Sequence, residues 1–241
     1  MADGEPPEAV RRLLVGEPIP PAWLSQITSL SLERARITDL GPLAALTALR
    51  HLVLSHTMVA DVTPLAALTG LQRLELTRSR VADVSALAGL MQLQRLHLSF
   101  TPVADVTPLA GLVALDGLFL SSTFVEDIGP LAGLVRLERL DLGGAPVRDA
   151  APLAGLTRLR SLDLAGTGIN DIAALAGLYR LQYLSLTSTR ISDLSPLAGL
   201  TDLRRLDLRS TAVRDLSALA HLRRCEIVTT ALRPRRRAPA P

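Results

Sequence analysis

The stretch HLSFTPVADVTPLAGL, residues 97–112, decides the fold, because most of it returns 88 residues later as SLTSTRISDLSPLAGL, residues 185–200. The separation is four steps of 22 residues, and leucines recur at the same step. Nine such units run from Ile27 to Arg224 without an insertion or deletion, which is the signature of a repeat architecture. The clearest mark of each unit is one aspartate: Asp39, Asp61, Asp83, Asp105, Asp127, Asp149, Asp171, Asp193 and Asp215.

The first part of each unit predicts a short strand. In LRHLVLSHT, residues 49–57, Leu52 and Leu54 alternate with His51 and Val53. A period of two places the leucines on one face of a strand. One strand cannot bury that face alone, so we expect successive units to stack and pair in parallel, about 4.8 Å apart.

The second part of each unit predicts a short helical turn. In VTPLAGL, residues 106–112, Thr107 is expected to be the N-cap, with Pro108 at the first helical position. Leu109 and Leu112 are three residues apart and are expected to face inward. The fold class is therefore α/β: a right-handed leucine-rich repeat solenoid with a concave parallel sheet and short helical or 3-10 turns on its convex side.

The segment LxxLxLxxT followed by D[VIL][ST]PLAGL resembles the bacterial leucine-rich repeat of the internalin-like type, over residues 27–232. The resemblance implies a solenoid with one strand per turn, and protein binding as its activity. The asparagine that the family places after the strand is absent. Threonine, serine or alanine stands there instead: Ala35, Thr57, Ser79, Thr101, Thr123, Ala145, Thr167, Thr189 and Thr211. We call these nine positions the threonine rank, and we interpret their side chains as buried groups that stabilise the turn after each strand.

The units divide the chain into four parts. These are an N-terminal cap at 1–26, nine repeats at 27–224, a degenerate capping repeat at 225–232 and a disordered basic tail at 233–241. A short helix is expected at 8–14, and Trp23 is expected to cover the first end of the core. Cys225 takes a leucine position, which predicts a buried, inert thiol.

Charge and hydropathy exclude several classes of function. The chain has 241 residues, 48% of them hydrophobic, and a net charge of +3. The tail carries four arginines, without which the chain is nearly neutral, so nucleic-acid binding is not expected. No apolar run approaches the roughly 20 residues of a membrane span. The N-terminus lacks the apolar core of a signal peptide, so the expected location is the cytoplasm.

Nine stacked carboxylates would repel one another unless each is hydrogen-bonded. We therefore predict that each repeat aspartate accepts backbone N–H groups in its own turn or the next. The alternative is a calcium ladder, but the nonapeptide of calcium-binding β-rolls is absent. His51 and His56 are five residues apart on an extended chain, too far to share an ion. No metal and no cofactor is predicted.

The positions that vary between repeats face outward and carry the candidate site. All three phenylalanines fall at outward positions of repeats four and five, and three of the four histidines fall in repeats two to four. Aromatic side chains flanked by arginine are typical of a protein-binding hot spot. The predicted partner-binding residues of this cluster are His51, His56, Glu75, Arg78, Arg95, His97, Phe100, Phe119 and Phe124.

Repeats six to nine carry a second candidate, an acidic stripe of Asp141, Asp163 and Asp207 with Tyr183 between them. Small residues beside the stripe leave room for a partner to approach. The competing interpretation is ordinary charge on a solvated sheet.

One constellation has the composition of a catalytic triad: Glu75, His97 and Ser99, which in-register strands would bring near one another. An open sheet offers neither an oxyanion hole nor a water-excluding pocket. The predicted function is a non-catalytic scaffold, a monomer or weak homodimer, that binds a protein partner on its concave face. The alternatives are an inhibitor, immunity-type or effector protein that blocks a partner's active site, and a self-assembling structural protein.

Overall fold

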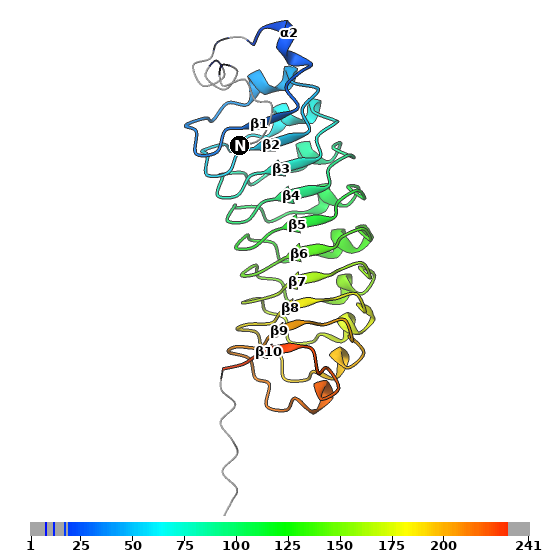
Figure 1. The fold of residues 1–241 in the computed structure, drawn as a ribbon. Helices are drawn as coiled ribbons and strands as arrows, with labels where there is room; N and C mark the ends of the chain where they lie inside the picture. Colours follow the sequence, from blue (N-terminus) through cyan, green and yellow to red (C-terminus); the bar gives the residue numbers. More distant parts are fainter. Residues whose placement is uncertain (1–7, 9–11, 13–16, 18, 231–241) are drawn as a thin grey trace, which may run out of the picture.

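The computed structural model of the chain describes residues 8, 12, 17 and 19–230. Its strands form one sheet of ten parallel members in sequence order (Figure 1). Each strand has three residues: β1 Ser29–Ser31, β2 His51–Val53, β3 Arg73–Glu75, β4 Arg95–His97, β5 Gly117–Phe119, β6 Arg139–Asp141, β7 Ser161–Asp163, β8 Tyr183–Ser185, β9 Arg205–Asp207 and β10 Glu226–Val228.

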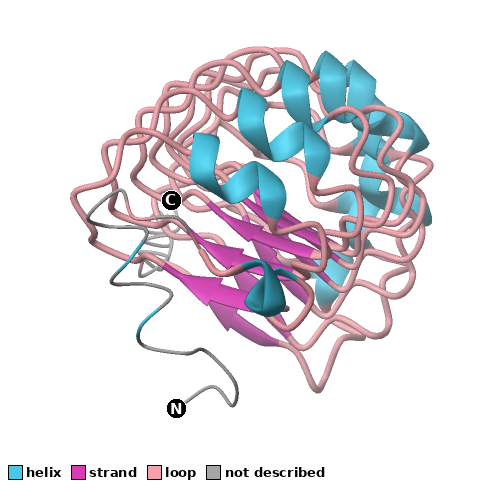
Figure 2. Ribbon diagram, turned by 90° about the horizontal axis from the view of Figure 1, so that it is seen from above, coloured by secondary structure: helices cyan, strands magenta, loops and turns pink. Residues whose placement is uncertain are grey.

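A 3-10 helix follows each of the first nine strands, and Figure 2 shows these helices on the side of the solenoid opposite the sheet. A short α-helix, α2 (Pro21–Leu24), lies directly before β1. The 3-10 helices are η1 Gly41–Ala45, η2 Thr63–Ala67, η3 Ser85–Leu87, η4 Thr107–Leu109, η5 Gly129–Gly133, η6 Ala151–Leu153, η7 Ala173–Gly177, η8 Ser195–Leu197 and η9 Ser217–Leu219. The predicted solenoid with a parallel sheet and 3-10 turns is confirmed.

The register of the sheet repeats the 22-residue step of the sequence. Leu52 pairs with Leu74, and Leu74 with Leu96, so identical repeat positions lie side by side. The inward leucines of strands and turns merge into one continuous core along the solenoid. Because the inward aliphatic residues fill this core, the outward side chains between the leucines take no part in it and can vary from repeat to repeat.

The repeat aspartates start the 3-10 helices. In all nine repeats, one carboxylate oxygen accepts the backbone N–H of the residue two positions on, at 2.7–2.8 Å. The predicted hydrogen bonding of the aspartates is confirmed. The expectation that Thr107 is an N-cap is wrong, since η4 begins at Thr107 and Val106 occupies the cap position. The Asp105 carboxylate instead accepts the backbone N–H of Thr107, the first residue of the 3-10 helix, at 2.8 Å.

The threonines of the threonine rank stabilise the turn after each strand, as predicted. In six repeats the hydroxyl donates to the carbonyl oxygen of the leucine three residues earlier, which directly follows the strand, at 2.5–2.7 Å. The bond fastens the turn that leaves the sheet, and it keeps these hydroxyls away from solvent.

The two ends of the core differ in how well they are covered. Trp23 is half-buried and packs against the first repeat, as predicted. Cys225 was expected to be buried but is half-buried, because it lies on the last turn of the described core. The predicted helix at 8–14 and the tail at 233–241 lie outside the described residues, apart from Glu8 and Arg12. No described helix has the length and hydropathy needed to cross a bilayer.

Candidate functional site

The centre of the concave face is an aromatic stack. His97 and Phe119 are register partners on β4 and β5, and their rings stack with centroids 4.1 Å apart and planes at 13°. Gly117 makes room for this arrangement, because a Cβ there would lie 3.3 Å from Cε2 of Phe119. The Phe119 ring therefore lies close over its own strand and reaches across to the neighbouring histidine.

Beside the stack, Arg78 and Phe100 occupy equivalent positions of neighbouring repeats, just past their strands. The Arg78 guanidinium lies over the Phe100 ring, 4.5 Å from its centroid. This cation–π contact holds Phe100 on the surface with 49% of its area exposed. We call Arg78, His97, Phe100 and Phe119 the aromatic surface.

Every residue at the position of Phe100 has a left-handed backbone, with φ between 54° and 73°. Glycine adopts this conformation freely, whereas other residues are strained by about 1 kcal/mol or more. Only two of the nine repeats use glycine there. The full rank is Arg34, His56, Arg78, Phe100, Ser122, Gly144, Gly166, Ser188 and Ser210.

Ion pairs fix the charges along one side of the aromatic surface. Arg73 binds the Glu75 carboxylate, with Nη2 2.6 Å from Oε1, and Arg95 Nε lies 3.3 Å from Oδ1 of Asp116. His51 is exposed at the outer end of the face, on β2. The candidate residues Glu75 and Arg95 are thus held by intramolecular partners.

The stacked histidine favours its neutral form. Burial lowers the pKa of His97, the positive charges of Arg73 and Arg95 act in the same direction, and the Glu75 carboxylate opposes them. The His97 ring at neutral pH is therefore uncharged imidazole, which stacks on the Phe119 ring without a desolvation cost for charge.

Glu75, His97 and Ser99 are not assembled as a catalytic triad. Glu75 is engaged by Arg73, the His97 ring stacks on Phe119, and Ser99 is buried. Among the described residues no hydrogen bond joins any two of the three. No group of three or more potential metal ligands is found in the same part of the chain.

Phe124 lies apart from the aromatic surface. It is 65% exposed and follows the turn that leaves β5, where it lines a hollow of about 510 Å³ with Asp105, Asp127 and Pro130. These neighbours belong to the 3-10 turns, so Phe124 stands on the flank of the solenoid and not on the sheet.

In the acidic stripe, Asp141 and Asp163 are register partners on β6 and β7. Each carboxylate turns back to accept the N–H group two residues on, at 2.9 Å from Gly143 and 2.8 Å from Ala165. Burial raises the pKa of Asp141, and the charge of Asp163 adds to the effect. Burial likewise raises the pKa of the half-buried Tyr183.

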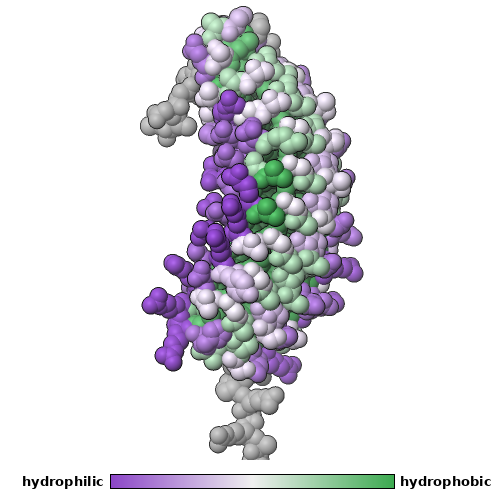
Figure 3. Space-filling model, turned by 90° about the vertical axis from the view of Figure 1, so that its right-hand side faces the viewer, coloured by the Kyte–Doolittle hydropathy of each residue, from purple (hydrophilic) through white to green (hydrophobic). Residues whose placement is uncertain are grey.

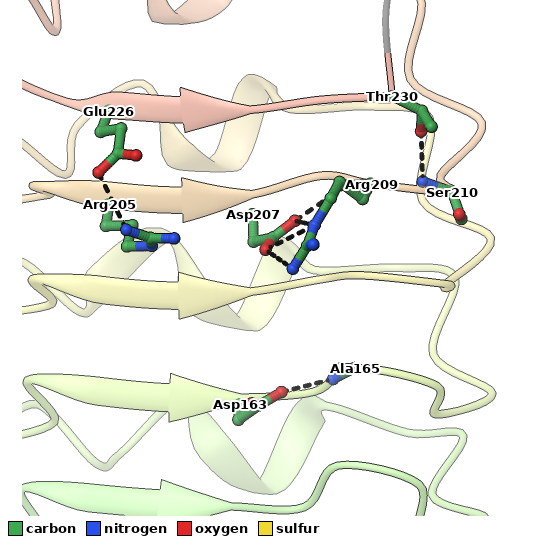
Figure 4. A network of polar contacts seen from close by, with 8 residues as sticks. All are labelled: Asp163, Ala165, Arg205, Asp207, Arg209, Ser210, Glu226 and Thr230. Carbon is green, nitrogen blue, oxygen red and sulfur yellow. Dashed lines mark hydrogen bonds and ion pairs between the residues drawn. The ribbon is translucent and has the colours of Figure 1, made fainter.

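Asp207 does not belong to an exposed stripe. It is only 3% exposed, and Arg209 folds back over it with Nη2 2.6 Å from Oδ2 (Figure 4). This ion pair lowers the pKa of Asp207 to about 2. The sequence could have predicted this ion pair. Arg209 occupies the repeat position that Gly143 and Ala165 occupy after Asp141 and Asp163.

Sequence reasoning missed an apolar rank on the side of the 3-10 helices. Figure 3 shows that side, where apolar residues run along the solenoid next to a hydrophilic column. Four large side chains of this rank are more than half exposed: Met91, Val113, Val135 and Tyr179. Each directly follows the last leucine of a turn, so the 22-residue step itself was the available signal.

The geometry of stacked strand-and-turn units defines a leucine-rich repeat protein. The family model for two copies of leucine-rich repeats matches residues 157–199 and 179–221. Comparison with the sequences of curated proteins gives no match. Among solved structures, an internalin (inlF) from Listeria monocytogenes is 30% identical with a TM-score of 0.88, and the alignment covers 93% of this chain and 68% of the internalin.

An internalin C2 (inlC2) from the same species is 33% identical with a TM-score of 0.70, over 92% of this chain and 91% of that protein. A leucine-rich repeat protein of Leptospira interrogans shares the fold, with 19% identity and a TM-score of 0.72 over 87% of this chain and 63% of that one. The chain belongs to the internalin-like family of bacterial leucine-rich repeat proteins.

Proposed function

We propose that the chain is a non-catalytic scaffold that binds a protein partner on its concave face, at the aromatic surface. The observation that supports this most strongly is the backbone of Phe100. Gly144 and Gly166 stand at the same repeat position, so glycine fits there without strain. A bulky, exposed ring at this position carries a backbone strain that glycine would avoid, which points to a role for its side chain.

The chemistry of the aromatic surface suits a protein partner. Exposed aromatic rings and arginine supply much of the binding energy in protein interfaces. Here the rings are already stacked, and the neighbouring arginines Arg73 and Arg95 are already paired with carboxylates. Little side-chain entropy is lost when such a surface binds, and this preorganisation is the proposed mechanism.

The test is capture of partners from lysate of the source cells. Wild-type protein is compared with a Phe100→Ala/Phe119→Ala double variant, after circular dichroism has shown that both are folded. We expect a protein that wild type retains and the double variant loses. The matched control is Phe124→Ala, which removes an exposed ring from the flank and is expected to retain the partner.

Retention of the same proteins by wild type and the double variant would contradict the proposal. Loss in the Phe124→Ala variant alone would move the binding surface to the flank. The cytoplasmic location, and a monomer or weak homodimer as the oligomeric state, stay predictions; gel filtration with light scattering at several concentrations tests the latter.

A further inference from the structure

A second polar site lies on the flank of repeats six to eight, away from the aromatic surface. The chain turns there directly after the strand ends, as Figure 4 shows beyond Ala165. The turns enclose a hollow of about 570 Å³, lined mainly by Arg148, Gly166, Gly168, Asn170, Ser188 and Arg190. We propose that this hollow binds an oxyanion between Arg148 and Arg190.

Glycines create the hollow. The repeat position of Gly168 carries a side chain in the other repeats, such as Pro146 before it and Arg190 after it. A Cβ on Gly168 would lie 2.9 Å from Cγ of Arg148 and 3.3 Å from the carbonyl oxygen of Val147. The stem of Arg148 therefore passes over Gly168, in space that only glycine leaves open.

The two arginines are available to a ligand. Within residues 19–230, neither Arg148 nor Arg190 has an ion-pair or hydrogen-bond partner, whereas Arg95, Arg205 and Arg209 each have a carboxylate within 3.3 Å. The aspartates nearest in sequence are turned elsewhere. Asp149 and Asp171 accept N–H groups of their own 3-10 turns, at 2.8 Å each.

The rest of the lining adds neutral donors and no negative charge. Asn170 and Ser188 line the hollow and can supply an amide and a hydroxyl, while the Thr167 hydroxyl donates to the carbonyl oxygen of Leu164 at 2.7 Å. Guanidinium forks match the oxygens of phosphate and carboxylate groups. No aromatic ring is among the described residues that line the hollow, so the chemistry that it recognises is the oxyanion itself.

The experiment titrates wild-type protein with inorganic phosphate and, separately, with hexaglutamate, at constant ionic strength so that screening does not change. Backbone amide shifts of Gly166 and Gly168 report on the hollow, and isothermal titration calorimetry gives the affinity. We expect saturable shifts with at least one probe. The dissociation constant should rise about tenfold or more in Arg148→Ala/Arg190→Ala, which lacks both forks.

The matched control is Arg80→Ala/Arg214→Ala. Arg80 and Arg214 occupy the same repeat positions as Arg190 and Arg148, but they lie in repeats three and nine, outside the hollow. This control removes the same charge and should change the affinity less than about twofold. Saturation by phosphate alone identifies a small anion as the ligand, and saturation by hexaglutamate alone identifies an acidic protein segment. No saturable binding of either probe, or equal losses in the two double variants, would overturn the proposal.

Discussion

At the scale of single residues, the left-handed position after each strand carries a side chain in most repeats, although the backbone there is strained for any residue other than glycine. The turn needs a positive φ in all nine repeats, yet seven of them place a side chain there. The hydrogen bonds around the turn, such as that from the Phe100 N–H to the carbonyl oxygen of Ser121 at 2.8 Å, hold the strained backbone in place.

The strain can be measured at Gly144, where φ is +73° and a Cβ would lie 3.3 Å from the Ser122 hydroxyl oxygen. Gly144→Ala should lower the free energy of unfolding by about 1 kcal/mol, because alanine resists a left-handed backbone. The control is Gly133→Ala, where φ is not positive and no atom lies within 4 Å. That change should raise stability by about 0.5 kcal/mol. Equal effects in urea unfolding would contradict the assignment of strain.

The Asp207–Arg209 pair makes a second residue-scale prediction. Arg209→Ala should lower the free energy of unfolding at pH 7, because it leaves a buried carboxylate without its charged partner. Arg214→Ala, an exposed arginine nearby in sequence, is the control and should change little.

The pH dependence follows from the lowered pKa of Asp207, about 2 in the fold against 3.8 when unperturbed. A depressed carboxyl pKa stabilises the fold fully above pH 3.8, and this contribution disappears as the pH falls towards 2. The stability difference between wild type and Arg209→Ala should therefore shrink over that window in urea titrations. A difference that stays constant from pH 5 to pH 2 would contradict the role of the pair.

At the scale of secondary-structure elements, the strands were predictable because their leucines pack inward at a fixed step, and the ladder pairs Leu52, Leu74 and Leu96 in register. The start of the 3-10 helix was misassigned, because Thr107 before Pro108 has the composition of a cap. The cap position is held by Val106, and the Asp105 carboxylate one residue earlier accepts the N–H of Thr107, in line with the hydrogen bonding predicted for the repeat aspartates. The left-handed turn was not predicted, because residues such as Phe100 and Arg78 give no sign of a positive φ.

Removing one repeat aspartate should weaken one 3-10 helix without destroying the solenoid. Asp127→Ala removes the acceptor for the Gly129 N–H, which now lies 2.7 Å from the carboxylate. The expected loss is about 1 kcal/mol in the free energy of unfolding, and Asp127→Asn should retain most of the stability, since its amide oxygen also accepts. Equal losses in the two variants would show that charge, and not the hydrogen bond, stabilises η5.

At the scale of the whole molecule, the repeat count and the parallel sheet followed from the spacing of 22, but the grouping of surface residues did not. The outward repeat positions predicted which side chains lie next to one another on the same face of the sheet, and the contact between His97 and Phe119 agrees with that prediction. Phe124 illustrates its limit: it stands five residues beyond Phe119, past the turn, where the chain has already left the concave face.

A solenoid whose repeats contact only their neighbours should open from its ends. The middle of the core is closed to solvent, since Leu118 is fully buried. The C-terminal end is less well covered, since Val213 and Leu222 are 8% exposed and Ile227 is half-buried. Amide hydrogen exchange should therefore be slowest in β5 and β6 and fastest in β10. Leu118→Ala should cost about 3 kcal/mol in global stability, whereas the same change at Leu222 should accelerate exchange only in the last repeats. Uniform protection from β1 to β10, unchanged in pattern by Leu222→Ala, would instead mean that the ten strands open as one cooperative unit.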